Sequence, residues 1–113
     1  MSDIERVICP KIAKAMKILS KRWTILIISQ LMKGKMRFHE LERSIPELSG
    51  KVLSVRLKEM ELDGLISRIS YREIPPRVEY SLTQMAQDLT PVIDTLTVWA
   101  DLYMNEEDNQ KSG

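Results

Sequence analysis

The 113-residue sequence predicts a mainly α-helical fold with a small β-hairpin. Apolar residues recur at helical spacing up to residue 63, alternate with polar residues over residues 65–82, and return to helical spacing from about residue 83. A chain of this length builds one compact core and is too short for two comfortable domains. We therefore expect residues 1–113 to form a single domain.

Two helices are expected first. One covers about residues 8–20, with Ile8 and Ile12 on its apolar face and Pro10 in a position that suits a first helical turn. The next covers residues 23–32 and is apolar nearly all round, which predicts a central, buried helix.

A helix-turn-helix unit is predicted over about residues 37–63. Its first helix is short and stops at Pro46, because proline cannot continue a helix. Ser49 is a suitable N-cap for the longer second helix, whose apolar face consists of Leu53, Leu57 and Met60. Two such helices joined by a tight turn form the unit.

A β-hairpin is predicted directly after this unit, over about residues 65–82. Residues 65–71 and 78–82 alternate apolar with polar side chains. The turn between them contains two prolines and has Arg72 and Arg77 at its ends. Helices followed by a two-stranded ribbon are the order of elements that a winged helix-turn-helix needs.

The chain closes with a predicted amphipathic helix over about residues 83–106, in which Pro91 should cause a kink. This helix presents more apolar surface than a small chain can easily cover. We therefore expect it to form, with the first helix, the interface of a homodimer, through Ile8, Ile12, Ile93, Leu96, Trp99 and Tyr103. The alternative is that the last helix folds back on its own core.

Charge is separated along the chain. Residues 1–39 contain nine Lys and Arg against two acids, whereas residues 78–113 contain one Lys against seven acids. Such a gradient can place one basic face on a molecule of formal net charge +1, as a phosphate-binding surface requires. The alternative is that the basic first segment pairs with the acidic last one.

The second helix of a helix-turn-helix enters the major groove of DNA with its N-terminal residues against base edges and phosphates. The side of this helix opposite its apolar face contains the expected DNA contacts, Ser49, Gly50, Lys51, Ser54, Val55 and Lys58. Gly50 would permit a close approach of the backbone. The alternative is an ordinary solvated helix face, which the arginine-flanked hairpin that follows makes the weaker interpretation.

Four further residues complete the expected DNA surface. Arg72 and Arg77 would touch the flanking backbone or minor groove from the wing. Arg37 and His39 lie at the start of the first helix of the unit and are expected to support phosphate contacts. The alternative role of the wing arginines is solubility.

No catalytic or metal site is expected, and no cofactor. His39 is the only histidine, and the sequence contains neither a glycine-rich phosphate loop nor a plausible Ser/His/Asp arrangement. The longest apolar run is too short for a bilayer and the N-terminus lacks signal-peptide regions, which predicts no membrane association. Because Cys9 is the only cysteine, no intrachain disulfide can form, which fits the cytoplasm.

Several motifs are characteristic of one family. They are Cys9-Pro10, Arg22-Trp23, Arg37-Phe38-His39-Glu40-Leu41, Ser49-Gly50-Lys51-Val52-Leu53 and, most specifically, Pro75-Pro76-Arg77-Val78-Glu79-Tyr80-Ser81-Leu82-Thr83. Through them the sequence resembles the HxlR family of MarR-like winged helix-turn-helix transcriptional regulators over about residues 8–103. It departs from the family at Ser20, Lys21 and Ala86, where glycine is common.

The resemblance implies a dimer built from the first and last helices that represses or activates nearby genes. A two-fold dimer would match a palindromic operator. In several members of the family the cysteine equivalent to Cys9 senses oxidants, quinones or other electrophiles through an intersubunit disulfide or alkylation. Nearby Lys11 and Lys14 and a helix N-terminus favour thiolate character. The alternative is a buried Cys9 without a signalling role.

Two other functions remain open from the sequence. The regulator could respond to a small-molecule ligand bound at the dimer interface, with Cys9 passive. From another class, the chain could be a winged-helix module that binds proteins rather than DNA. Donors on both the groove helix and the wing argue against the latter, because such a module does not need them.

Overall fold

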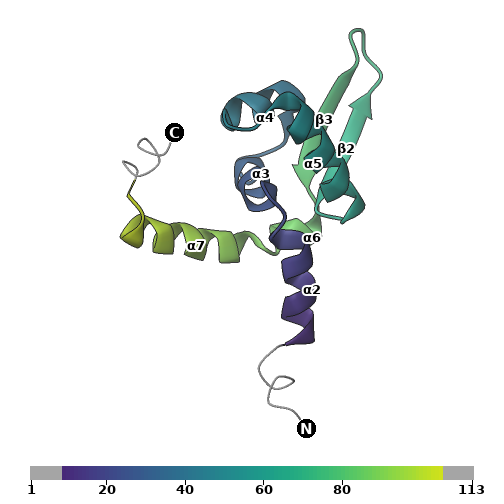
Figure 1. The fold of residues 1–113 in the computed structure, drawn as a ribbon. Coiled ribbons are helices and arrows are strands. Elements are labelled where there is room, and N and C mark those ends of the chain that lie inside the picture. The colour runs from purple at the N-terminus through teal and green to yellow at the C-terminus, as the bar shows by residue number, and fades with distance from the viewer. Residues whose placement is uncertain (1–8, 106–113) are drawn as a thin grey trace.

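The structure, a computed structural model, describes residues 9–105, so the expected interface residue Ile8 lies outside the described residues. Figure 1 shows the elements in the predicted order, helices before and after a hairpin. They are α2 (Pro10–Leu19), α3 (Thr24–Leu31), β1 (Met36–Arg37), α4 (Phe38–Ser44), α5 (Gly50–Leu62), β2 (Ile66–Tyr71), β3 (Arg77–Leu82), α6 (Gln84–Gln87) and α7 (Thr90–Tyr103).

The hydrophobic core lies where α3, α4, α5 and the base of the hairpin meet. The face of α5 predicted from its spacing is buried, and consists of Leu53, Leu57 and Met60. Ser49 caps this helix as expected, because its hydroxyl accepts a hydrogen bond from the Val52 N–H at 3.2 Å. Because these three residues pack in the core, the opposite side of α5 must face outward.

The central helix α3 differs from its prediction in two respects. It buries Ile27, Ile28 and Leu31 but leaves Leu26 half-exposed, so it is not enclosed on all sides. It also begins one residue later than expected, because Trp23 has a φ of 76° and serves as the N-cap. Side chains other than glycine rarely adopt this left-handed conformation.

The sheet has three antiparallel strands in the order β1-β3-β2. The predicted hairpin is formed by β2 and β3, in which Ile66 lies opposite Leu82. The sequence does not predict β1, where Met36 lies opposite Tyr80. Two residues are too few to show an alternating pattern, and only the pairing with β3 defines this strand.

The last helical segment is interrupted, and the prediction of one continuous kinked helix is wrong. α6 ends at Gln87, and α7 begins at Thr90 with Pro91 in its first turn. A proline there sacrifices no helical hydrogen bond, since the first N–H groups of a helix have no intrahelical acceptor. Pro91 therefore stands at the start of a second helix and does not bend a longer one.

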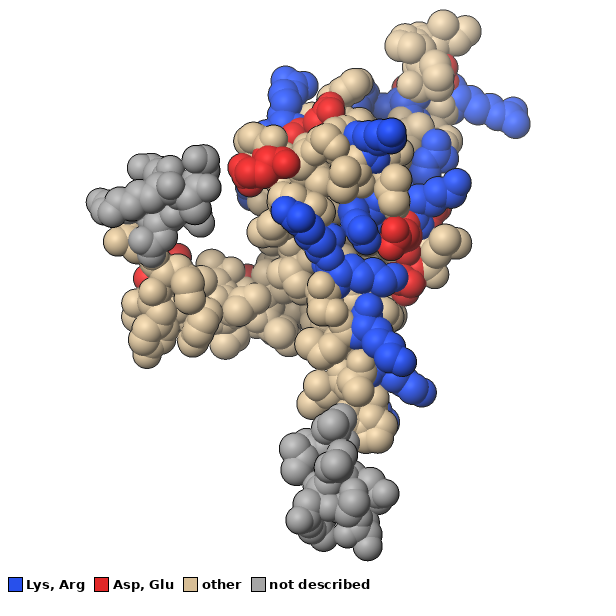
Figure 2. Space-filling view, in the orientation of Figure 1, with Lys and Arg blue, Asp and Glu red and all other residues tan. Residues whose placement is uncertain are grey.

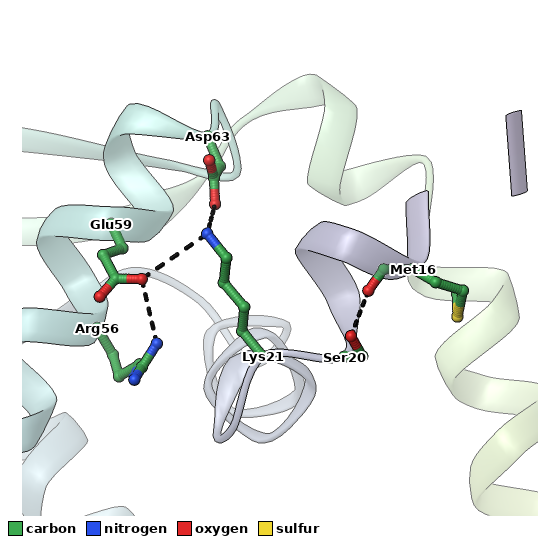
Figure 3. A network of polar contacts seen from close by, with 6 residues as sticks. All are labelled: Met16, Ser20, Lys21, Arg56, Glu59 and Asp63. Carbon is green, nitrogen blue, oxygen red and sulfur yellow. Dashed lines mark hydrogen bonds and ion pairs between the residues drawn. The ribbon is translucent and has the colours of Figure 1, made fainter. Parts of the chain in front are cut away.

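A polar network ties the turn between α2 and α3 to the C-terminal half of α5 (Figure 3). Lys21 Nζ lies 3.1 Å from Asp63 Oδ2 and 3.7 Å from Glu59 Oε2. Arg56 Nη1 donates to the same Glu59 oxygen at 3.1 Å. On the other side of Lys21, Ser20 donates from its hydroxyl to the carbonyl of Met16. The network therefore sets α2 relative to the helix expected to read DNA.

Two helices extend from the body of the molecule. Figure 1 shows α2 and α7 pointing away from the core in different directions. None of the α2 residues is buried, and Ile93 is the buried residue of α7, at 4% exposure. The assignment of Ile93 to the dimer interface is therefore wrong, because its side chain packs in the core of its own subunit.

Candidate nucleic-acid interface

The expected groove-reading residues of α5 share one exposed side. Lys51, Ser54, Val55 and Lys58 are all exposed, whereas the buried residues of the helix lie on the other side. Lysine and serine supply charge and hydrogen-bond donors, and Val55 supplies an apolar contact of the kind that a thymine methyl accepts. The structure thus brings these residues together on a rigid helix.

Gly50, the first residue of α5, lies next to α4. A side chain at this position would meet the carboxylate of Glu42, with Phe38 close behind. The close approach that glycine permits here is therefore to α4 of the same subunit. An approach of the DNA backbone to Gly50 stays a prediction.

The two wing arginines differ in their surroundings. Arg77 Nε lies 3.2 Å from Glu73 Oε2, and its guanidinium lies over the Tyr71 ring, 4.1 Å from the centroid. Arg72 is exposed in the turn. Arg77 therefore already makes an ion pair and a ring contact within the hairpin, whereas Arg72 is exposed.

The supporting residues lie on both sides of the α4 N-terminus. Arg37 belongs to β1 and, with Ile74 and Arg77, lines a hollow at the hairpin turn. His39 is exposed at the start of α4, and its Nδ1 lies 4.0 Å from Glu42 Oε1. The structure thus brings Arg37 to the wing, which the sequence does not predict.

A second hollow, of about 400 Å³, separates α5 from the hairpin. Ser54, Lys58 and Glu61 line it from α5, and Arg68 and Tyr80 from the strands. Arg68 is opposite Tyr80 in the register, so both side chains project from the same face of the sheet. Arg68 was not predicted from the sequence, because the burial of Ile66 on this face and the position of α5 over it are known only from the structure.

Basic side chains are numerous on the face of the molecule seen in Figure 2. Figure 2 shows a band of Lys and Arg that runs from the hairpin across α5 to α2. The projecting helix α7 contains no Lys or Arg. Lys35 pairs with Glu79 at 3.7 Å, so the basic first segment does meet the acidic last segment there. Lys21, however, pairs with Glu59 of α5 and with the C-cap residue Asp63. Charge pairing therefore coexists with an uncovered basic surface.

The other expected functional residues lie on the projecting helices. Cys9 is exposed immediately before α2, which excludes the alternative of a cysteine buried within the subunit. Ile12 is 62% exposed, and on α7 Leu96, Trp99 and Tyr103 are 46%, 50% and 71% exposed. Trp99 and Tyr103 contact each other with ring centroids 5.8 Å apart.

Residues 9–105 contain neither a metal-binding cluster nor a membrane-spanning helix. Within this range no group of three or more His, Cys, Asp and Glu could hold a metal ion. No helix in the same range is long and apolar enough to cross a membrane.

The sequence profile of the HxlR-like helix-turn-helix family matches residues 18–108, which include every element from α3 to α7. This chain belongs to the HxlR family.

Relatives of this HxlR-family chain are transcriptional regulators. YvaP, an HTH-type transcriptional regulator of Bacillus subtilis (strain 168), is 50% identical over 92 residues, covering 81% of this chain and 85% of YvaP. YodB, an HTH-type transcriptional regulator of the same organism, is 40% identical over 100 residues, covering 88% of this chain and 89% of YodB.

Solved structures agree with the fold of this HxlR-family chain. The reduced form of B. subtilis YodB matches with a TM-score of 0.75 at 40% identity, over 87% of this chain and 96% of that one. The oxidized form of the redox regulator HypR matches with a TM-score of 0.79 at 30% identity, over 86% and 99%. YodB has also been solved after diamide treatment and with bound quinone.

These matches confirm the predicted winged helix-turn-helix. The chain is accordingly a DNA-binding transcriptional regulator of the HxlR type.

Proposed function

We propose that this HxlR-family regulator is a cytoplasmic homodimer that binds a palindromic operator. The observation that carries the proposal is the exposed side of α5, where Lys51, Ser54 and Lys58 present donors on a helix fixed by its buried side. In this proposal, that side enters the major groove, and two subunits place their α5 helices about one DNA turn apart.

The remaining contacts surround α5. The N-cap Ser49 and the first amides of the helix face a phosphate, as helix N-termini do. Gly50 begins the helix at the same point. Arg72 and Arg77 extend the surface along the wing, and Arg37 and His39 contact the backbone beside α4.

The dimer is proposed to form through α2 and α7. Val92, Leu96, Trp99 and Tyr103 follow one another at i, i+4, i+7 and i+11, so they form one apolar stripe, and all are about half-exposed or more. Val92 replaces Ile93 in this stripe, since Ile93 lies about a quarter turn away and is buried. A contiguous apolar surface of this kind marks an interaction site. Ile12 of α2 completes the interface.

Regulation is proposed to act through Cys9, with a small oxidant or electrophile as the effector. The exposed thiol and the diamide-treated and quinone-bound structures of YodB support this assignment.

Regulation by a small-molecule ligand is a second proposal, which an apolar hollow in the subunit favours. An apolar hollow of about 220 Å³ lies between α2 and α6, lined by Ala15, Ile18, Leu19, Leu65, Met85 and Leu89. A small apolar ligand in this hollow would control the dimer with Cys9 passive.

The DNA-binding proposal is tested by a gel shift on the DNA directly upstream of the protein's own gene. We expect Lys51→Ala to weaken binding by about tenfold and Arg77→Ala to weaken it less, with the dimer intact in both. Lys33→Ala is the matched control, because Lys33 lies in the turn after α3. Wild-type affinity of Lys51→Ala and Arg77→Ala at physiological salt would contradict this placement of helix and wing. A wild-type protein that binds no DNA would favour a protein-interaction module.

A further inference from the structure

The hollow between α5 and the hairpin contains an unusual collection of donors. Lys58 and Arg68 contribute two cationic groups, and Ser54 and Tyr80 contribute two hydroxyls. Glu61 is the one acidic residue in the lining. The hollow is predominantly polar and lies between α5 and the hairpin, two elements over which Figure 2 shows basic side chains.

Arg68 is oriented within this hollow by its own strand. Its Nη1 donates a hydrogen bond to Ser70 Oγ at 3.2 Å, and Ser70 projects from the same face of β2. A guanidinium has five N–H groups, so one bond to a hydroxyl leaves donors available. Arg68 can therefore bind a second acceptor while its side chain stays in place.

We propose that this hollow holds one phosphate of the DNA backbone, with Arg68 and Lys58 as its principal ligands. The inference rests on the proposed function, because a duplex whose major groove receives α5 must pass its backbone between that helix and the wing. Arginine binds phosphate through two parallel hydrogen bonds, and lysine binds it as a point charge. The hydroxyls of Ser54 and Tyr80 donate to the remaining phosphate oxygens.

Glu61 gives the proposal a distinctive consequence. In the free protein its carboxylate offsets part of the positive charge of Lys58 and Arg68. When a phosphate enters, the same carboxylate repels it. Removal of the Glu61 charge should therefore tighten DNA binding, whereas removal of the Arg68 charge should weaken it.

A phosphate contact is independent of base sequence, so it is tested on a short labelled duplex of arbitrary sequence over a range of salt concentrations. We expect Arg68→Gln to bind about tenfold more weakly, with a salt slope shallower by about 0.9 for each hollow that engages the duplex. Arg68→Lys should keep the wild-type slope. Glu61→Gln should bind about threefold more tightly, a gain that misfolding cannot imitate.

Lys33→Gln serves as the charge-matched control, since Lys33 flanks Met32 and Gly34, which line a different hollow beside α6 and α7. Unchanged affinity and slope for Arg68→Gln, or a Glu61→Gln variant that binds no more tightly, would overturn the phosphate site. If Lys51→Ala still weakens binding in that case, the proposed function stands and only the hollow is misassigned. If Lys51→Ala also has no effect, the placement of α5 in the groove fails as well.

Discussion

At the scale of single residues, Cys9 is exposed and lies at the start of α2. Its carbonyl accepts the Ala13 N–H at 3.0 Å, so the backbone of Cys9 helps begin α2, but its side chain makes no capping bond. The thiol can therefore be modified without the loss of a capping hydrogen bond at the start of α2. Because α2 is proposed to lie at the dimer interface, a change at Cys9 would act where the two subunits meet.

Cys9→Ser is expected to bind the upstream DNA as the untreated wild type does but to retain that binding in diamide or a quinone. The physical reason is that a hydroxyl neither forms a disulfide nor is alkylated under these conditions. The measurement is a gel shift with and without the reagent. Release of Cys9→Ser at the wild-type reagent concentration would reject the sensor and favour a ligand in the α2–α6 hollow.

Sequence periodicity identified the orientation of α5 but not the neighbours of individual residues. The positions of Leu53 and Leu57 follow from helical spacing alone. The pairing of Arg77 with Glu73, and the carboxylate of Glu42 beside Gly50, depend on side-chain positions that no local pattern specifies. The sequence therefore predicted which side of α5 is exposed, but not which side chains contact one another.

At the scale of elements, α5 is held from two directions. Its apolar face packs in the core, and its C-terminal half is bound by Lys21 from the turn between α2 and α3. The side chains of Lys21, Glu59 and Asp63 are only 37%, 37% and 25% exposed, so solvent screens this network less than a fully exposed pair. The network links a proposed interface helix to the proposed groove helix.

Lys21→Met is expected to lower the free energy of unfolding by less than about 1 kcal/mol, because both partners remain partly solvated. The measurement is urea unfolding of Lys21→Met, Asp63→Asn and the double variant. A coupling energy indistinguishable from zero in that cycle would show that the network contributes nothing to stability. Lys17→Met, an exposed lysine in the last turn of α2, is the control and should unfold as the wild type does.

The sequence predicted the hairpin, but it did not predict two boundaries of other elements. The hairpin was predictable because two alternating runs surround a proline turn. The break between α6 and α7 was not, because apolar spacing continues through it and Pro91 suits either a kink or a helix start. Likewise β1 exists only through its pairing with β3.

At the scale of the whole molecule, apolar and basic surfaces are segregated. The basic band covers α5 and the hairpin side, whereas α7 projects elsewhere with an apolar stripe and no cation (Figure 2). One side of α7 packs on its own subunit through Ile93, and the stripe that contains Trp99 is left uncovered. A dimer through α7 would therefore cover the apolar stripe and leave both basic surfaces available for one duplex.

Trp99→Glu is expected to convert the dimer to a monomer, because it places a charge in the centre of the apolar stripe, where burial without a partner is costly. Size-exclusion chromatography with light scattering measures the state directly. Val98→Glu is the matched control, since Val98 is exposed on the same helix but lies outside the stripe, and it should remain dimeric. The monomer should also bind its operator at least about a hundredfold more weakly, because the second half-site no longer binds in an intramolecular step. A Trp99→Glu protein that elutes as a dimer with unchanged DNA affinity would place the subunit contact on another surface.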